Sequence, residues 1–101
     1  MRETIDMPNG KKFLMENLTP GERFDFLSAV GSNWNSAPYM FTAEAVCSVR
    51  EIDGVAISLP SSVSELKARA DELGDAGVDA ATEWLQKNNK YNLPNKEAAK
   101  N

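Results

Sequence analysis

Carboxylates form the densest group of chemically capable side chains in the sequence: Asp71, Glu72, Asp75, Asp79 and Glu83. No basic residue lies among them. Asp75, Asp79 and Glu83 recur at every fourth position, so a helix would place them on one face. Three interpretations fit this spacing: a docking surface for a basic partner, a cation site, or a solvated helix face with Asp75 as the N-cap. The cation site fits least well because the spacing matches no EF-hand loop.

Aromatic residues form a second candidate site. Trp34 lies in the polar residues 31–38 (Gly-Ser-Asn-Trp-Asn-Ser-Ala-Pro), and Tyr39 and Phe41 follow at the start of an expected helix. Trp34 either closes the core from its loop or serves as a binding residue, because tryptophan is enriched at binding hot spots. A core of this size has little room for all three aromatics. We therefore expect at least one of them to be exposed, in a contact patch for a partner helix or a second copy.

Several kinds of enzyme are excluded by composition. Histidine is absent, which rules out Ser-His-Asp and Cys-His catalysis and His-ligated metals. Cys47 is the single cysteine, so an internal disulfide and a Cys-rich zinc site are excluded as well. We interpret Cys47 as a small buried hydrophobe rather than a reactive thiol. The sequence therefore favours a protein that is not an enzyme and that binds no cofactor or metal.

Charge and length restrict the partners and the domain count. The chain has 101 residues, a net charge of −4 and a pI near 4.8. An acidic chain repels phosphate backbones and anionic lipids, so we expect neither a nucleic-acid partner nor a membrane. The first residues lack the apolar core of a signal peptide, and with one free thiol this predicts a cytoplasmic protein.

The elements that must position these residues begin with a β-hairpin. Residues 8–10 (Pro-Asn-Gly) suit a three-residue loop in which Gly10 adopts the left-handed conformation of a G1 bulge. This register pairs Ile5 with Phe13. Asp53 and Gly54 predict a second hairpin with a type I′ turn, in which the residues on one face are Ile52, Val55, Ile57 and Leu59.

The rest of the sequence carries start and stop signals for helices. Thr19 and Glu22 form a capping box for a first helix that ends near Gly31, and its apolar residues at helical spacing are Phe24, Leu27 and Val30, with Phe26 beside them. A second helix is expected over residues 39–49. A third begins at the capping box of Ser62 and Glu65 and ends at Gly74, and a fourth covers residues 75–88, where Gly77 weakens the first turn.

These signals together predict an α+β fold with two short hairpins and about four helices. We expect a single domain over residues 3–88, followed by a flexible polar tail over residues 89–101 that carries several lysines.

The order of the turn and cap signals resembles a known family. Residues 8–10 (Pro-Asn-Gly) close an early extended segment, and residues 18–23 (Leu-Thr-Pro-Gly-Glu-Arg) open a helix. Residues 49–54 (Val-Arg-Glu-Ile-Asp-Gly) and a break at residues 59–61 (Leu-Pro-Ser) then precede a leucine-containing helix. This order is similar to that of the small tail assembly chaperones of long-tailed bacteriophages. It departs from the family pattern at Met7, where leucine is usual, and in the asparagine-rich loop around Trp34.

The resemblance implies a non-catalytic role in the host cytoplasm. Such a chaperone covers the long helical tape measure protein and keeps it soluble until tail tube subunits assemble around it. The tape measure protein is then the expected partner, with the tail tube protein and a second copy of the chain as further candidates. Two alternatives stay open: a permanent structural component of a phage tail or baseplate, and a small acidic regulatory protein. The lack of a basic helix argues against a regulator that binds DNA.

Overall fold

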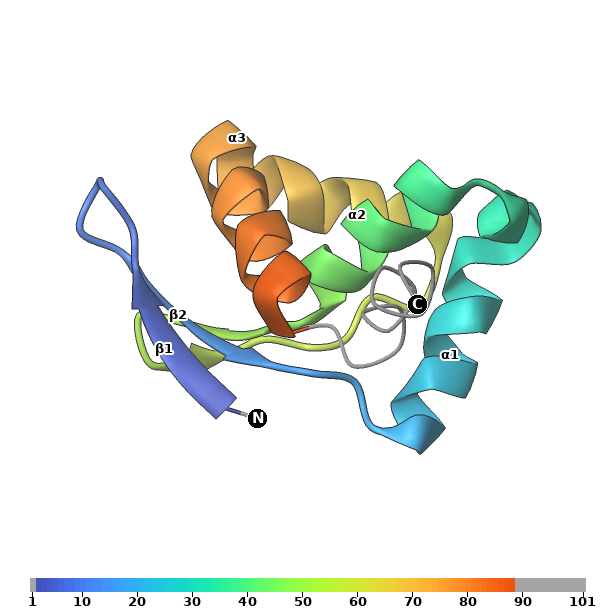
Figure 1. Cartoon of the computed structure of the whole chain (residues 1–101), viewed down its shortest axis with the longest axis horizontal. Helices are drawn as coiled ribbons and strands as arrows, with labels where there is room; N and C mark the ends of the chain where they lie inside the picture. Colours follow the sequence, from blue (N-terminus) through green and yellow to red (C-terminus); the bar gives the residue numbers. More distant parts are fainter. Residues whose placement is uncertain (1, 89–101) are drawn as a thin grey trace, which may run out of the picture.

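The computed structural model describes residues 2–88, which form an α+β domain (Figure 1). Within this range a four-stranded antiparallel sheet in the order β1-β2-β3-β4 is combined with three α-helices and one 3₁₀ helix. Figure 1 shows α2 and α3 over one face of the sheet, whereas α1 lies beyond its end. The α+β class is confirmed, although four helices were expected. The tail expected over residues 89–101 lies outside the described residues.

The N-terminal hairpin forms in the predicted register. Strands β1 (Arg2–Asp6) and β2 (Lys12–Glu16) pair antiparallel, and Ile5 lies opposite Phe13. Gly10 has a φ of 91°, in the left-handed region that the loop requires. On the face away from the helices, Lys12 Nζ lies 2.8 Å from Asp6 Oδ1. Local turn chemistry therefore determines this part of the fold.

The second hairpin joins the first in one sheet, which the sequence patterns did not indicate. Strands β3 (Val49–Ile52) and β4 (Val55–Ala56) flank Asp53 and Gly54, whose φ angles of 53° and 84° suit the predicted type I′ turn. Strand β3 also pairs with β2. The turn is held to β2 by two hydrogen bonds, because the Lys12 amide donates to Asp53 Oδ1 at 2.9 Å and the Asp53 amide donates to the Lys12 carbonyl at 2.8 Å.

The first two helices differ from expectation in their limits and orientation. Helix α1 (Pro20–Val30) begins at the predicted capping box. The 3₁₀ helix η1 (Gly31–Asn35) replaces the expected loop, and α2 (Ala37–Cys47) begins two residues early because Ser36 caps it and Pro38 is tolerated in its first turn. Phe24 and Leu27, which share helical spacing with the buried Val30, are both exposed.

The expected third and fourth helices form one kinked element, α3 (Val63–Asn88). The kink is at Gly74, whose φ of 76° and ψ of 172° are essentially restricted to glycine. The second capping box also differs from expectation. Ser62 Oγ accepts from the Glu65 amide at 3.1 Å, but the Glu65 carboxylate accepts from the amide and hydroxyl of Ser61, one residue before the cap.

Two buried clusters make up the core. The sheet-side cluster comprises Met7, Phe13, Met15, Ala45, Val49, Ala81, Trp84 and Leu85. The helix-side cluster comprises Leu18, Phe26, Ala29, Val30, Ala43, Cys47 and Leu66. Helices α2 and α3 contribute to both clusters, and the kink directs the two halves of α3 to different ones. Among residues 2–88, no helix has the length and hydropathy that crossing a bilayer requires.

Candidate functional site: an apolar edge

The most prominent surface feature is a group of exposed apolar side chains on α1 and η1. Phe24 and Leu27 are 74% and 42% exposed, and Trp34 on η1 is 66% exposed. Phe24 and Leu27 are three residues apart, so they share the outer face of α1, while Phe26 and Val30 fill the core on its inner face. We call Phe24, Leu27 and Trp34 the apolar edge.

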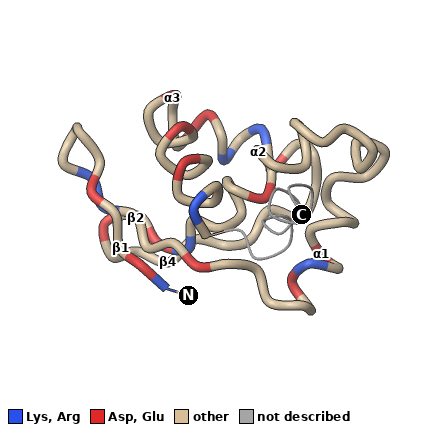
Figure 2. The backbone as a smooth tube through the Cα atoms, viewed as in Figure 1, with Lys and Arg blue, Asp and Glu red and all other residues tan. Residues whose placement is uncertain are grey.

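Two of the three residues of the apolar edge, Leu27 and Trp34, belong to a stretch of chain without charge, whereas Phe24 lies between Arg23 and Asp25. No Lys, Arg, Asp or Glu occurs between Asp25 and Glu44. Figure 2 shows the consequence in space: the end of the molecule formed by the second half of α1, by η1 and by the start of α2 is uncharged, in contrast to the acidic positions along α3. Because soluble domains usually surround exposed aromatics with charges, the uncharged end that carries Leu27 and Trp34, with Phe24 about one turn earlier on α1, is a candidate contact surface.

A groove between α2 and α3 adds to this surface. Its volume is about 430 Å³, and the residues that line it are Pro38, Tyr39, Thr42, Ala43, Val46, Leu66, Lys67 and Ala70. Lys67 is the single charged residue in that lining. Two helix walls with small and apolar side chains are the geometry in which an apolar side chain from a partner helix can be buried.

The predicted aromatic patch is only partly brought together. Trp34 is exposed as expected for one of the three, and Tyr39 is half-buried and lines the groove. Phe41 is half-buried against the sheet-side cluster, so it does not join the apolar edge. Phe24 and Leu27 were missed. Phe24 and Leu27 are spaced as a core-facing stripe, and so are Phe26 and Val30. No local signal in the sequence shows which pair faces the core.

The predicted acidic site is spread along the surface of α3. Asp75, Asp79 and Glu83 are all exposed, and they follow the kink at Gly74 on one side of the second half of the helix. Within residues 2–88, no group of three potential metal-ligating side chains is close enough to hold an ion. The arrangement is that of a solvated face, and it offers charge to a partner rather than a coordination site.

Arg50 links the sheet to the start of α1. Its guanidinium donates two hydrogen bonds to Glu22, at 2.7 and 2.8 Å, and two more to the backbone carbonyls of Glu16 and Asn17, at 3.2 and 3.0 Å. This bidentate pair lowers the pKa of Glu22 to about 2, assisted by the backbone hydrogen bond from Thr19. The pair fixes the angle of α1, and hence the direction in which Phe24 and Leu27 point.

A second ion pair connects α1 to α2. Arg23 Nη2 lies 2.6 Å from Glu44 Oε2, and Glu44 is buried. The guanidinium carbon of Arg23 also lies 5.9 Å from the centre of the Phe26 ring, in cation–π geometry. The contact balances the charge of Glu44 inside α2 and holds the inner face of α1 against that helix.

The thiol of Cys47 has a structural position. It is buried in the helix-side cluster, and this burial raises its pKa to about 12. A thiol with so high a pKa has almost no thiolate at neutral pH, so it is a poor nucleophile. The sequence-based interpretation of Cys47 as a buried hydrophobe is confirmed.

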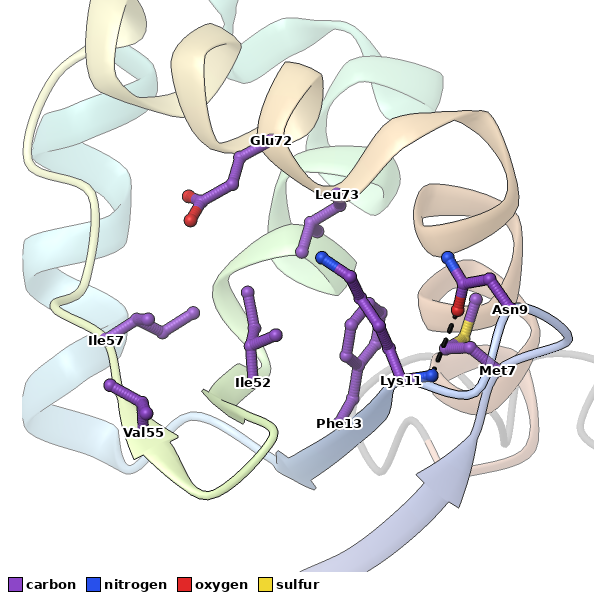
Figure 3. Close-up of a pocket in the computed structure, with 9 residues that line it drawn as sticks. All are labelled: Met7, Asn9, Lys11, Phe13, Ile52, Val55, Ile57, Glu72 and Leu73. Carbon is purple, nitrogen blue, oxygen red and sulfur yellow. Dashed lines mark hydrogen bonds between the residues drawn. The ribbon is translucent and has the colours of Figure 1, made fainter.

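A separate pocket of about 300 Å³ lies under the kink of α3. Figure 3 shows an apolar floor formed by Phe13 and Ile52, with Leu73 above it and charged side chains at its rim.

Comparisons of the chain with family models, curated proteins and solved structures found no match. The functional inference therefore depends on these surfaces and on the sequence resemblance.

Proposed function

We propose that this chain is a non-catalytic tail assembly chaperone that binds an amphipathic helical segment of a phage tape measure protein. The observation that carries the proposal is the apolar edge, where Phe24 and Trp34 are 74% and 66% exposed and Trp34 lies in a stretch without charge. Side chains of this kind supply most of the binding energy in protein interfaces. The order of turns and caps that resembles the chaperone family gives the identity of the partner.

The groove beside α2 suits the same task. A helix that presents an apolar stripe can insert side chains between Tyr39 and Leu66 while the rest of the stripe covers the apolar edge. A tape measure helix exposes such stripes over a great length. Many copies of a small domain along one target multiply weak contacts into stable coverage. The net charge of −4 on each copy then keeps the complex soluble.

Co-expression with the tape measure protein of the same phage tests the proposal. The parent chain is expected to keep that protein in the soluble fraction, and a Phe24→Ala/Trp34→Ala variant is expected to lose most of this effect. Both side chains are exposed, so the double variant should unfold at nearly the parent temperature. An Asp75→Asn/Asp79→Asn variant is the matched control from the acidic face of α3.

Two outcomes would overturn the proposal in different ways. If the aromatic double variant folds and still solubilises the tape measure protein, the apolar edge is not the binding surface. If only the acidic double variant loses the effect, the surface is α3 instead. Mass spectrometry of mature particles distinguishes a chaperone, which is absent from them, from a permanent tail component, which is present.

A further inference from the structure

Strand β1 forms one edge of the sheet and has an unused side. The strand order is β1-β2-β3-β4, so within residues 2–88 no strand pairs with the outer side of β1. Figure 1 shows β1 at the margin of the molecule, and four of its five residues are exposed. Strand β4 at the opposite edge has two residues. The longer edge is the better template for another strand, because it offers more backbone hydrogen bonds.

The hydrogen bonds of the hairpin determine which backbone groups of β1 point outward. The Met7 amide donates to the Lys11 carbonyl at 2.7 Å, which makes these residues a hydrogen-bonded pair. Hydrogen-bonded and non-bonded pairs alternate along an antiparallel ladder, so Asp6 and Lys12 are a non-bonded pair. In agreement, the Lys12 carbonyl accepts from the Asp53 amide on its other side, at 2.8 Å. By the same alternation, the outward-pointing amides and carbonyls of β1 are those of Arg2, Thr4 and Asp6.

The sequence of β1 is complementary in charge to itself. If a second copy of β1 pairs antiparallel about Thr4, Arg2 lies opposite the partner's Asp6, and the two Thr4 side chains face each other. All of these pairs use the outward backbone groups of both copies. Opposite charges and threonine pairs directly across from each other both stabilise a sheet. A shift of two residues either brings Glu3 against the partner's Glu3 or moves Arg2 past the end of the partner's strand, so this register is preferred.

Ion pairs within each copy extend this complementarity across the outer face of the sheet. Arg2 Nε lies 3.7 Å from Glu16 Oε1, and Lys12 Nζ lies 2.8 Å from Asp6 Oδ1. In the paired sheet the charges alternate from negative to positive in the order Glu16, Arg2, the partner's Asp6 and the partner's Lys12. Each exposed ion pair is weak alone, but the alternating row favours a second copy over a strand that lacks this order of charges.

Helix α3 leaves room for the second copy. A Cβ at Gly77 would lie 3.2 Å from Phe13 Cζ, and Asn17 Nδ2 donates to the Asn88 carbonyl at 3.1 Å, so the second half of α3 follows β2 rather than β1. The two copies of this helix would then be about three strand spacings, or about 14 Å, apart, which exceeds the helix diameter of about 10–12 Å. A hollow of about 200 Å³ between α3 and β1 leaves space there for side chains.

We propose that β1 pairs with β1 of a second copy of this chain, antiparallel about Thr4, so that two four-stranded sheets become one. The dimer is closed, because each copy uses its β1 edge on the other. The apolar edge belongs to α1 and η1 and takes no part in the pairing. The inference is therefore independent of the proposed function.

Hydrogen exchange of the full chain, followed by ¹⁵N–¹H NMR from about 10 μM to about 1 mM protein, tests the proposal. The amides of Thr4 and Asp6 should exchange more slowly as the concentration rises, because they become bonded to the second copy. The Ile5 amide points toward β2 and should change less. Sedimentation velocity over the same range should show a monomer converting to a dimer, with no larger species.

Charge reversal tests the register. Arg2→Glu and Asp6→Arg each place like charges opposite each other in the self-paired dimer, and each should weaken association about tenfold. An equimolar mixture of the two variants should recover association, because both facing pairs in the mixed dimer are again of opposite sign. Lys67→Glu is the matched control, since it changes the net charge as Arg2→Glu does, at an exposed position on α3. It should leave association unchanged.

Several results would overturn the pairing of β1 with itself. One is a chain that stays monomeric at about 1 mM. Another is a dimer whose concentration-dependent protection is confined to α1, η1 and α2, which would place the contact at the apolar edge. A mixture of Arg2→Glu and Asp6→Arg chains that associates no better than either alone would rule out the register. These tests use no tape measure protein, so their failure leaves the proposed function untouched.

Discussion

At the residue scale, the side chains with shifted pKa values serve the architecture. Arg50 satisfies one carboxylate and two backbone carbonyls, and it does so at the point where the sheet meets α1. Glu22 is shared between Arg50 and the helix cap at Thr19. Because these partners lower the pKa of Glu22 in the folded state, protonation of Glu22 couples pH to stability.

Acid should weaken the fold through Glu22. Its pKa is lowered from an ordinary 4.5 to about 2, so its contribution is complete above the unfolded value and is lost as pH falls between these limits. Because the carboxylate is partly exposed, we expect a loss of about 1–2 kcal/mol rather than the full shift. Urea unfolding at several pH values checks this. Glu22→Gln should reduce the fall in unfolding free energy at acid pH, whereas Asp79→Asn, at an exposed carboxylate, should not.

Gly77 is required by packing, in contrast to the expectation that it merely weakens its helix. A Cβ at this position would lie 2.9 Å from Leu73 Cβ and 3.2 Å from Phe13 Cζ. Gly77→Ala gains about 1 kcal/mol of helix propensity, but the overpacking costs about 1–3 kcal/mol. We expect a net destabilisation of up to about 2 kcal/mol in chemical denaturation.

Gly21→Ala is the control for Gly77→Ala, since nothing lies within 4 Å of a Cβ at Gly21 in the first turn of α1. That substitution should be neutral or stabilising by up to about 1 kcal/mol. A stabilising Gly77→Ala would show that α3 can move away from the sheet at no cost.

At the element scale, features set by neighbouring residues were predictable from sequence. The turn at Gly10, the type I′ turn at Gly54 and the cap at Thr19 each depend on a few adjacent residues, and all three form as expected. The pairing of β2 with β3 joins residues far apart in the chain, so no local pattern indicates it. The exposure of Phe24 was unpredictable for the same reason, because contacts with α2 and α3 determine which face of α1 is buried.

The two helix caps should differ in strength. Thr19 exchanges reciprocal hydrogen bonds with Glu22 at 2.9 and 3.1 Å, whereas Ser62 accepts one bond from the Glu65 amide. Thr19→Ala and Ser62→Ala should each cost about 0.5–2 kcal/mol, with Thr19→Ala the larger loss. Midpoints of urea unfolding measure both. The reverse order would mean that Arg50 holds Glu22 without help from the cap.

At the scale of the whole molecule, the apolar edge and the acidic face of α3 are built from different parts. The apolar edge depends on α1 and η1, which are attached through the helix-side cluster, whereas Asp75, Asp79 and Glu83 belong to the second half of α3.

The two tryptophans allow coverage of the apolar edge to be observed directly. Trp34 is 66% exposed, whereas Trp84 is 4% exposed and donates to Glu3 at 2.9 Å. A Trp84→Phe variant therefore reports on Trp34 alone, at a cost of about 1 kcal/mol for the lost hydrogen bond and about 1–2 kcal/mol more for the smaller side chain in the core. In the free protein its fluorescence should be red-shifted and readily quenched by acrylamide. Binding of the tape measure protein should shift the emission to shorter wavelength and reduce quenching severalfold, because burial excludes water and quencher from the indole.

A Trp34→Phe variant supplies the comparison, since the emission of Trp84 should be blue-shifted from the start and unchanged by the partner. The partner segment must contain no tryptophan, so that every change in emission comes from this chain. Complex formation is verified by co-elution in size-exclusion chromatography. If the complex forms while Trp34 stays fully accessible to acrylamide, the partner does not cover the apolar edge. The binding surface would then have to lie where Trp34 cannot sense it, and the acidic face of α3 is the place to examine next.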